Sequence, residues 1–462
     1  MVERGLAWGE RHATRILLVL SLLALAAFLA TIPLPHADGM LIGSDGIGYY
    51  MYVRSIALDG DIDFANEAEA LNAAKYIDIY RTPTGRISNQ YALGTPLLWL
   101  PFFLAAHLLS LGLRAMGLPV PADGYGYIYQ AAVCVGSIVY GSCAVLLMHR
   151  TARRLFPGTA LAACVALFLA TNFAYYLIAE PSMAHMCSVF AASLLVYLWV
   201  SLRPLTAPAR CLTIGLAGGL VGLVRQPDAV LLLMPTLDAL LARGTVREKG
   251  KRMAAVAAGF FAIFWAQMLV WYILNGSPFL SGYLLKGDQG FVWGAPRLLD
   301  VLFSTRHGLF LWHPVLLIGF AGLALLARQN PAMGGLLLAG FAAQTYVIAA
   351  WSAWWQGDAF GGRMFMATLP IFAIGLAAFL QRVRARPVLA TASLAAIAVL
   401  VVWNALFMAQ YRLGYISRGG PYTPCANSLG GRRKCWRRLS SAWRNDLRRP
   451  PRCSHPSFRA QS

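Results

Sequence analysis

The sequence predicts an all-α polytopic membrane protein with about eleven transmembrane helices. Hydrophobic residues make up 58% of the 462 residues, and the mean hydropathy is +0.58. Apolar runs recur at close to the roughly 20 residues that a helix needs to cross a bilayer. Lys and Arg gather in short segments between these runs, an arrangement that orients membrane proteins. The formal charge of +20 is therefore a topology signal, and no nucleic-acid partner is expected.

The first apolar run, Ile16 to Pro33, follows a basic segment that contains Arg4, Arg11 and Arg15. It lacks an Ala-x-Ala cleavage site, so we expect a retained helix and not a signal peptide. Because the basic segment is expected on the cytoplasmic side, residues 34–93 form the first extracytoplasmic loop.

The next apolar run, Gly94–Leu113, conflicts with this charge pattern. Tyr127–Met148 is a clear span, and the arginines in 149–154 should lie inside. Two full crossings would leave those arginines outside. We therefore interpret Gly94–Leu113 as a juxtamembrane or re-entrant helix on the outer face. An ordinary span that breaks the charge rule is the alternative.

The remaining spans follow the charge pattern. Cys211–Ala242 must begin and end inside, so we expect two short helices hinged at Pro227, with Arg225 toward the outer half of the membrane. The other expected spans are Gly158–Ile178, a span ending at Arg203, Met253–Leu274, Gly308–Ala327, Met333–Ala350, a span ending at Arg382, and Pro387–Ala409.

This topology brings several polar stretches to one face. They are the acidic loop 34–93, the turn with His185, the break at Arg225, the loop 275–306, and the turn before Arg363. Loop chemistry gathered on one side of a helical scaffold indicates a site there.

Within the acidic loop, Asp45 is the candidate general base. It lies in Gly-Ser-Asp-Gly-Ile-Gly-Tyr-Tyr, where small residues allow a substrate hydroxyl to approach closely. A helix cap or a solvated loop acid is the simpler explanation. Tyr49, Tyr50 and Arg54, which follow directly, are candidate substrate contacts.

Asp59 and Asp61 are candidate substrate-binding residues in the sequence Asp-Gly-Asp-Ile-Asp. Hard oxygen ligands at this spacing could hold a divalent cation, but a full ligand set is missing. The alternative is solvated acids at the start of an outer-face helix. The metal is left open, and no other cofactor is expected.

Arg225, Arg306 and Arg363 stand at the outer ends of spans, where the guanidinium fork could bind a phosphate. Each arginine alone could instead extend to lipid headgroups. His185 is a candidate contact, although a lone histidine more often fills a hydrogen-bonding role. Trp351 and its neighbours suit either an interfacial belt or a sugar-stacking platform.

A set of short motifs resembles the GT-C superfamily of integral-membrane glycosyltransferases, over roughly residues 10–410. The nearest branches are the bacterial protein-mannosyltransferase-like and aminoarabinose-transferase-like ones. The motifs are Ser44-Asp45-Gly46 with Asp59-Gly60-Asp61, Pro96-Leu97-Leu98-Trp99, Arg153-Arg154-Leu155-Phe156 and Phe360-Gly361-Gly362-Arg363.

The resemblance implies an inverting hexosyl- or pentosyltransferase of the bacterial inner membrane that serves the cell envelope. A polyprenyl-phosphate-linked sugar would be the donor, and a glycan, lipid or protein hydroxyl the acceptor, on the extracytoplasmic face among membrane lipids. The first-loop aspartate would be the base, by position Asp45. A transporter or flippase of lipid-linked sugars is the alternative class.

Two parts of the chain are expected to differ. Residues 1–420 form the GT-C-like transmembrane domain. Residues 421–462 are rich in Arg, Ser and Pro and nearly without apolar periodicity, so we expect a basic disordered tail or an aberrant terminus.

Overall fold

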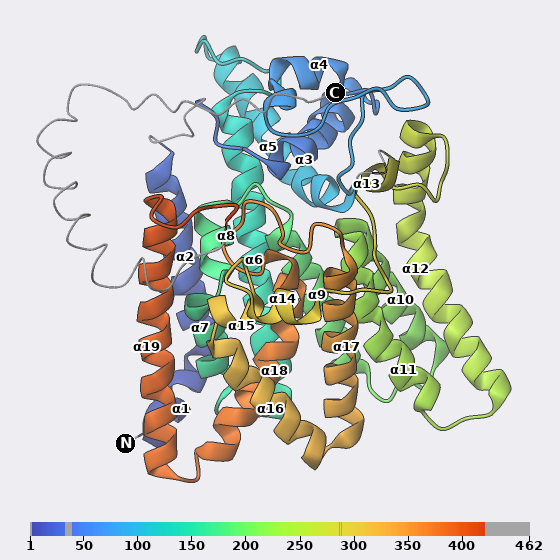
Figure 1. Ribbon diagram of the computed structural model, residues 1–462. Coiled ribbons are helices and arrows are strands. Elements are labelled where there is room, and N and C mark those ends of the chain that lie inside the picture. Colours follow the sequence, from blue (N-terminus) through green and yellow to red (C-terminus); the bar gives the residue numbers. More distant parts are fainter. Residues whose placement is uncertain (1, 33–38, 286, 288, 421–462) are drawn as a thin grey trace, which may run out of the picture.

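The computed structural model describes residues 2–32, 39–285, 287 and 289–420, and these form an all-helical bundle (Figure 1). Within this part of the chain the extended pairing is limited to two isolated bridges, Arg81 with Ile87 and Phe291 with Trp351. The predicted all-α membrane fold is confirmed. The expected tail, 421–462, lies outside the described residues.

Eight described helices are long and apolar enough to cross a membrane. They are α2 (Ala13–Thr31), α5 (Gly94–Ala115), α6 (Tyr127–Leu155), α9 (His185–Leu202), α12 (Val246–Asn275), α17 (Pro331–Ala350), Arg363–Val383, which contains α18 (Leu369–Val383), and α19 (Pro387–Arg412). Three shorter apolar helices are α7 (Ala160–Ala170), α10 (Pro208–Val224) and α16 (Val315–Gln329).

Two expected spans are interrupted. The first divides into α7 and α8 (Phe173–Ile178), and Asn404 of α19 donates to the Thr171 carbonyl freed at the break, at 2.9 Å. The second divides into α15 (Leu309–Trp312) and α16 around His313-Pro314. Proline removes a backbone donor and restricts the residue before it, so a continuous helix is disfavoured at that point.

The expected break near Arg225 is present. After α10 comes the 3₁₀ segment η3 (Gln226–Leu232) and then α11 (Leu233–Leu241). A Cβ at Gly218 would meet the Leu232 side chain, so the chain folds back along α10. Arg252 of α12 donates to the carbonyls of Thr206 and Ala242, which flank the two helices. The two helices therefore form a hairpin whose ends lie at one end of the bundle.

Helix α5 pairs with only the first half of α6. The Tyr140 hydroxyl donates to the Leu98 carbonyl at 3.0 Å, and His107 Nδ1 lies 2.8 Å from the Tyr129 hydroxyl. Eight further residues carry α5 past this point, or about 12 Å at 1.5 Å per residue. Helix α5 thus runs antiparallel to the first half of α6 and continues beyond its start.

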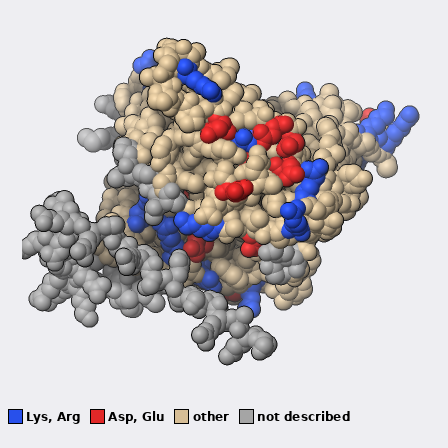
Figure 2. All heavy atoms as spheres, turned by 90° about the horizontal axis from the view of Figure 1, so that it is seen from above, with Lys and Arg blue, Asp and Glu red and all other residues tan. Residues whose placement is uncertain are grey.

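A layer of short elements covers one end of the bundle, drawn uppermost in Figure 1. It contains α3 (Asp45–Arg54), the π-helical η1 (Ser55–Asp59), α4 (Ala65–Ala70), η2 (Ala73–Lys75) and α13 (Gly282–Leu285). Figure 2 shows carboxylates gathered on this face. The short α14 (Leu298–Phe303) lies lower, near α15.

The opposite end carries α1 (Val2–Arg11), an amphipathic helix that the sequence analysis did not anticipate. Glu10 accepts a hydrogen bond from the Leu161 amide at 2.7 Å and contacts His149 at 3.0 Å. These contacts hold α1 beside α6 and α7, at the end predicted to be cytoplasmic.

The two ends of the bundle should differ in accessibility from outside the cell. Glu69 in α4 and Arg247 at the start of α12 are both exposed. With a membrane-impermeant thiol reagent on intact cells, Glu69→Cys should be labelled, and Arg247→Cys should be labelled only after permeabilisation. The unsubstituted protein gives the background. If Arg247→Cys were labelled in intact cells and Glu69→Cys were not, the predicted orientation would be wrong.

Candidate functional site

A cavity of about 480 Å³ lies between the covering layer and the bundle. Its walls come from stretches that are distant in sequence: the start of α3, the segment before α5, the start of α9, the break after α10, the loop with α13, and the turn that precedes η4 (Arg363–Thr368). These are the polar stretches that the sequence analysis expected on one face.

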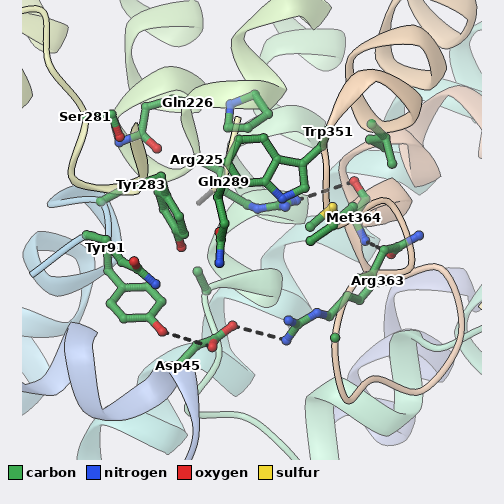
Figure 3. Close-up of a pocket in the computed structure, with 18 of the residues that line it drawn as sticks. Asp45, Tyr91, Arg225, Gln226, Ser281, Tyr283, Gln289, Trp351, Arg363 and Met364 are labelled. Atoms are coloured by element: carbon green, nitrogen blue, oxygen red, sulfur yellow. Dashed lines mark hydrogen bonds and ion pairs between the residues drawn. The ribbon is translucent and has the colours of Figure 1, made fainter. Parts of the chain in front are cut away.

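Asp45 lines the cavity and lies between Tyr91 and Arg363 (Figure 3). It is the first residue of α3, and Ser44 before it has φ of 52°, so the chain turns sharply into the helix. The helix N-terminus favours a carboxylate. One carboxylate oxygen accepts from the Tyr91 hydroxyl at 3.0 Å, and the other lies 3.1 Å from Arg363 Nη1. The carboxylate is 31% exposed, so it is fixed in position but open to the cavity.

Tyr91 reaches Asp45 because Gly48 leaves room for its ring. A Cβ at Gly48 would lie 2.0 Å from the Tyr91 ring, a distance that no side chain can occupy. Burial raises the pKa of Tyr91 well above its usual value, and the neighbouring Asp45 raises it further. The phenol therefore stays protonated and donates to the carboxylate.

Two arginines face the same space. Arg363 lies two residues after Gly361, which has φ of 68°, and the Arg363 side chain is 13% exposed. Arg225 lies in extended backbone between α10 and η3, and its Nη1 donates to the Met364 carbonyl at 3.4 Å. That carbonyl belongs to the residue after Arg363, and both arginine side chains line the cavity. Together they could bind an anion.

Aromatic and amide side chains line the rest of the cavity (Figure 3). Trp351 packs edge-on against Tyr283 and Phe291, with ring centroids 6.0 and 4.9 Å apart. Among the described atoms, His185 Nδ1 and Gln226 Nε2 are buried without a hydrogen-bond partner. Buried polar atoms are rarely left unsatisfied, so this wall is suited to a polar ligand.

The structure brings some of the predicted site residues together and separates others. Asp45, Tyr49, His185, Arg225 and Arg363 line the cavity. Tyr50, Arg54, Asp59, Asp61 and Arg306 do not.

Arg54 takes part in a buried ion-pair network. Its guanidinium pairs with Glu67 at 2.7 Å and also with Asp59, and Glu67 is fully buried. Burial raises the pKa of Glu67 to about 7, although Arg54 opposes that rise. Arg54 and Asp59 thus connect α3, η1 and α4 within the covering layer.

Asp61 is engaged in local hydrogen bonds, and Tyr50 in a contact with the next loop. The Ser55 hydroxyl and the Asp63 amide both donate to Asp61 Oδ1, at 2.8 and 3.1 Å. The Tyr50 hydroxyl donates to the Gly124 carbonyl at 2.6 Å. Within the described part of the chain, no three His, Cys, Asp or Glu side chains are grouped as ligands for a metal ion.

The tryptophans of the turn before Arg363 occupy different surroundings. Trp351 belongs to the cavity wall. Trp355 lies under Arg306, whose guanidinium carbon is 4.8 Å from the ring centroid, a cation–π distance. The Trp355 carbonyl is 2.6 Å from His307 Nδ1.

Sequence reasoning missed several residues of the cavity. Tyr91, Gln226, Tyr283 and Gln289 line it, but none stands in a recognisable motif. Of these residues, Gln226 could have been found from the sequence, because it lies in Arg225-Gln226-Pro227-Asp228. Charged residues inside an apolar stretch need partners and therefore indicate a polar site.

No protein-family model matches the chain, and no curated protein matches it. Among solved structures, the chain is similar to an oligosaccharyltransferase of Archaeoglobus fulgidus, crystallised with Zn and sulfate, with a TM-score of 0.45 and 16% identity. The match covers 93% of this chain and 55% of that one, so the chain spans about half the length of this structural relative. A similarity this distant assigns neither a substrate nor a residue role.

The Arg54–Glu67 pair should matter for stability more than for the cavity. Arg54→Ala removes the partner of a buried carboxylate and should lower Tm in detergent, with a loss of about 1.4 kcal/mol for each pH unit above 7, because Glu67 can take up a proton instead. Since ionised Glu67 needs Arg54 and protonated Glu67 does not, the Tm deficit should be larger at pH 8 than at pH 6. It should shrink as the pH falls through about 7, where the Glu67 carboxyl takes up a proton.

Two further variants test this assignment. Arg86→Ala is the matched control, because Arg86 in the same loop donates to the Ile62 carbonyl and should change Tm little. Adding Glu67→Gln to Arg54→Ala should restore part of the lost Tm. A normal Tm in Arg54→Ala, combined with weaker substrate binding, would instead indicate that Arg54 contacts the substrate.

Proposed function

We propose that the protein is an inverting glycosyltransferase that moves a sugar from a polyprenyl-phosphate donor to an acceptor hydroxyl, on the extracytoplasmic face of the membrane. The observation that carries the proposal is the convergence of Asp45, Arg225 and Arg363 on one cavity at the end of a membrane bundle. The motif resemblance to the GT-C superfamily points to the same reaction.

The chemistry needs a base and an anion site, and the cavity offers both. The Asp45 carboxylate would take the proton of the acceptor hydroxyl as its oxygen attacks the anomeric carbon. The bond from that carbon to the phosphate oxygen breaks, and its electron pair stays on the phosphate. Arg225 and Arg363 would stabilise the charge that develops there.

The proposed reaction is a single displacement in which Asp45 acts as the base and no residue of the protein becomes glycosylated. A single displacement at the anomeric carbon inverts its configuration. Tyr91 and Arg363 each occupy one side of the Asp45 carboxylate, and every carboxylate oxygen has a further lone pair for the acceptor proton.

Arg363 could serve both partners at once. A guanidinium has five N–H donors, so Arg363 could keep its contact with Asp45 while binding a phosphate oxygen. The donor would then be placed beside the base. The aromatic and amide wall, with Trp351 and Gln226, is suited to a polyhydroxylated sugar.

A flippase of lipid-linked sugars is the second candidate, and one observation favours it. Asp228 is buried next to the broken span at Arg225, and discontinuous helices with internal charge are a feature of transporters. Such a protein would move the lipid-linked sugar without breaking its phosphate bond.

In the deciding experiment, the purified protein is incubated with polyprenyl-phosphate donors. These donors carry a neutral hexose, a pentose or an aminopentose. Release of polyprenyl phosphate in the presence of a mixed envelope-glycan and lipid acceptor is measured, with and without a chelator. We expect release from at least one donor. Donor translocation in vesicles without release would support the flippase.

Asp45→Asn should lower turnover by about 10² to 10⁴, because a general base typically contributes that much. Donor binding should remain close to normal, since the amide keeps the shape of the side chain. Asp61→Asn is the matched control, an acid of the same loop outside the cavity, and it should keep turnover. Near-normal turnover in Asp45→Asn would remove the proposed mechanism.

Arg363→Gln should weaken donor binding, because a charge-assisted contact to phosphate is lost. We expect the donor KM to rise by about tenfold or more, for a contact worth about 1.5–3 kcal/mol. Arg306→Gln is the control, an arginine that stacks on Trp355 outside the cavity. Equal effects of the two substitutions would contradict a specific phosphate site at Arg363.

A further inference from the structure

The break after α10 sends two charged side chains to different places. Arg225, with φ of −155° and ψ of 108°, leaves the helix and lines the cavity. The Asp228 amide donates to the Arg225 carbonyl at 3.0 Å, which closes a tight turn. Asp228 itself does not line the cavity and is fully buried.

Three donors from three elements meet the Asp228 carboxylate. The Ser188 hydroxyl of α9 donates to Oδ2 at 2.6 Å, and Gln344 Nε2 of α17 donates to Oδ1 at 3.0 Å. Arg225 Nη1 also lies 3.4 Å from Oδ1. A buried carboxylate is costly unless it is paired and hydrogen-bonded, and here both oxygens are engaged.

Gln344 is one of the donors to the Asp228 carboxylate. Its side chain is buried, and its Oε1 has no hydrogen-bond partner among the described atoms. The amide group thus points its nitrogen at the carboxylate although its own oxygen stays unsatisfied, which is unfavourable.

The Arg225 guanidinium is held at two points. Its Nη1 contacts Asp228 on one side and the Met364 carbonyl on the other, both at 3.4 Å. The guanidinium has further N–H donors beyond that nitrogen. Met364 directly follows Arg363, so this double contact ties the Arg225 side chain to the backbone beside Arg363.

We propose that Asp228 is a positioning residue for the donor phosphate: it holds Arg225 in the orientation in which its guanidinium faces the cavity beside Arg363. This inference rests on the proposed function. Asp228 also balances the charge of Arg225 in the bundle, so the arginine need not turn toward water. Ser188 and Gln344 donate hydrogen bonds that fix the Asp228 carboxylate, which in turn contacts Arg225.

The test uses Asp228→Asn, which keeps the shape of the side chain and loses the charge. Donor KM and kcat are measured separately, and binding of polyprenyl monophosphate is measured directly. We expect KM and the dissociation constant to rise about tenfold, as for a lost charge-assisted hydrogen bond, and kcat to fall as well because Arg225 also stabilises the charge that develops on the phosphate. Asp238→Asn is the matched control, because Asp238 pairs with Arg203 at 2.8 Å away from the cavity.

A double variant tests whether Asp228 acts through Arg225. Arg225→Gln alone should raise KM, and adding Asp228→Asn should raise it no further. Independent effects of the two substitutions on KM would overturn the proposal. So would a lower kcat and lower Tm at unchanged KM, which is what a merely structural role predicts.

Two further measurements keep the test decisive. If Asp228→Asn does not fold, Ser188→Ala removes one of the three donors and should raise KM by a smaller factor; an unchanged KM would count against the proposal. If the unsubstituted protein consumes no donor, the proposed function fails. The binding of polyprenyl monophosphate by Asp228→Asn still decides the role of Asp228.

Discussion

The ion pair between Asp45 and Arg363 joins the two halves of the cavity. The residues are 318 positions apart, one at the start of α3 and the other at the start of η4, and their side chains meet at 3.1 Å. Water is partly excluded there, so the attraction is stronger than at an open surface. The covering layer, with Tyr91 on the other side of Asp45, is thereby tied to the end of the bundle. The geometry of the candidate base follows from this contact.

Polar function in this bundle lies where helices are interrupted. The chain leaves helical geometry at Thr171, at Arg225 and at His313, and each break frees backbone groups or exposes a side chain. Asn404 satisfies the carbonyl at the first break, and Asp228 engages the arginine at the second. Interior breaks in a membrane bundle need such partners, because lipid offers none. Of these three breaks, the one at Arg225 places a charged side chain on the cavity wall.

Most of the fold could be predicted from apolar length and basic loops, which are properties of local sequence. The hairpin after Cys211 followed from parity of charge and from Pro227, whereas the pairing of α5 with the first half of α6 has no counterpart in the sequence pattern. The cavity was predictable only in part. Asp45, Arg225 and Arg363 carried charge at marked positions, whereas Tyr91 and Gln289 have no local signal and join the site through tertiary packing. In the sequence, Arg54 and Arg363 both look like arginines near an outer-face loop. Arg54 forms an ion pair with the buried Glu67, and only the three-dimensional contacts distinguish the two arginines.

The hairpin of α10 and α11 has a consequence for biogenesis. At 17 and 9 residues, neither helix matches the roughly 20 residues of an ordinary span, so the pair enters the bilayer with a polar tip between them. One donor to that tip, Gln344, lies 116 residues further along the chain than Asp228. While the ribosome makes the intervening segment, the Asp228 carboxylate has Ser188 and Arg225 but not its third partner. The hydrogen bonds of Asp228 are therefore complete only after α17 has been made.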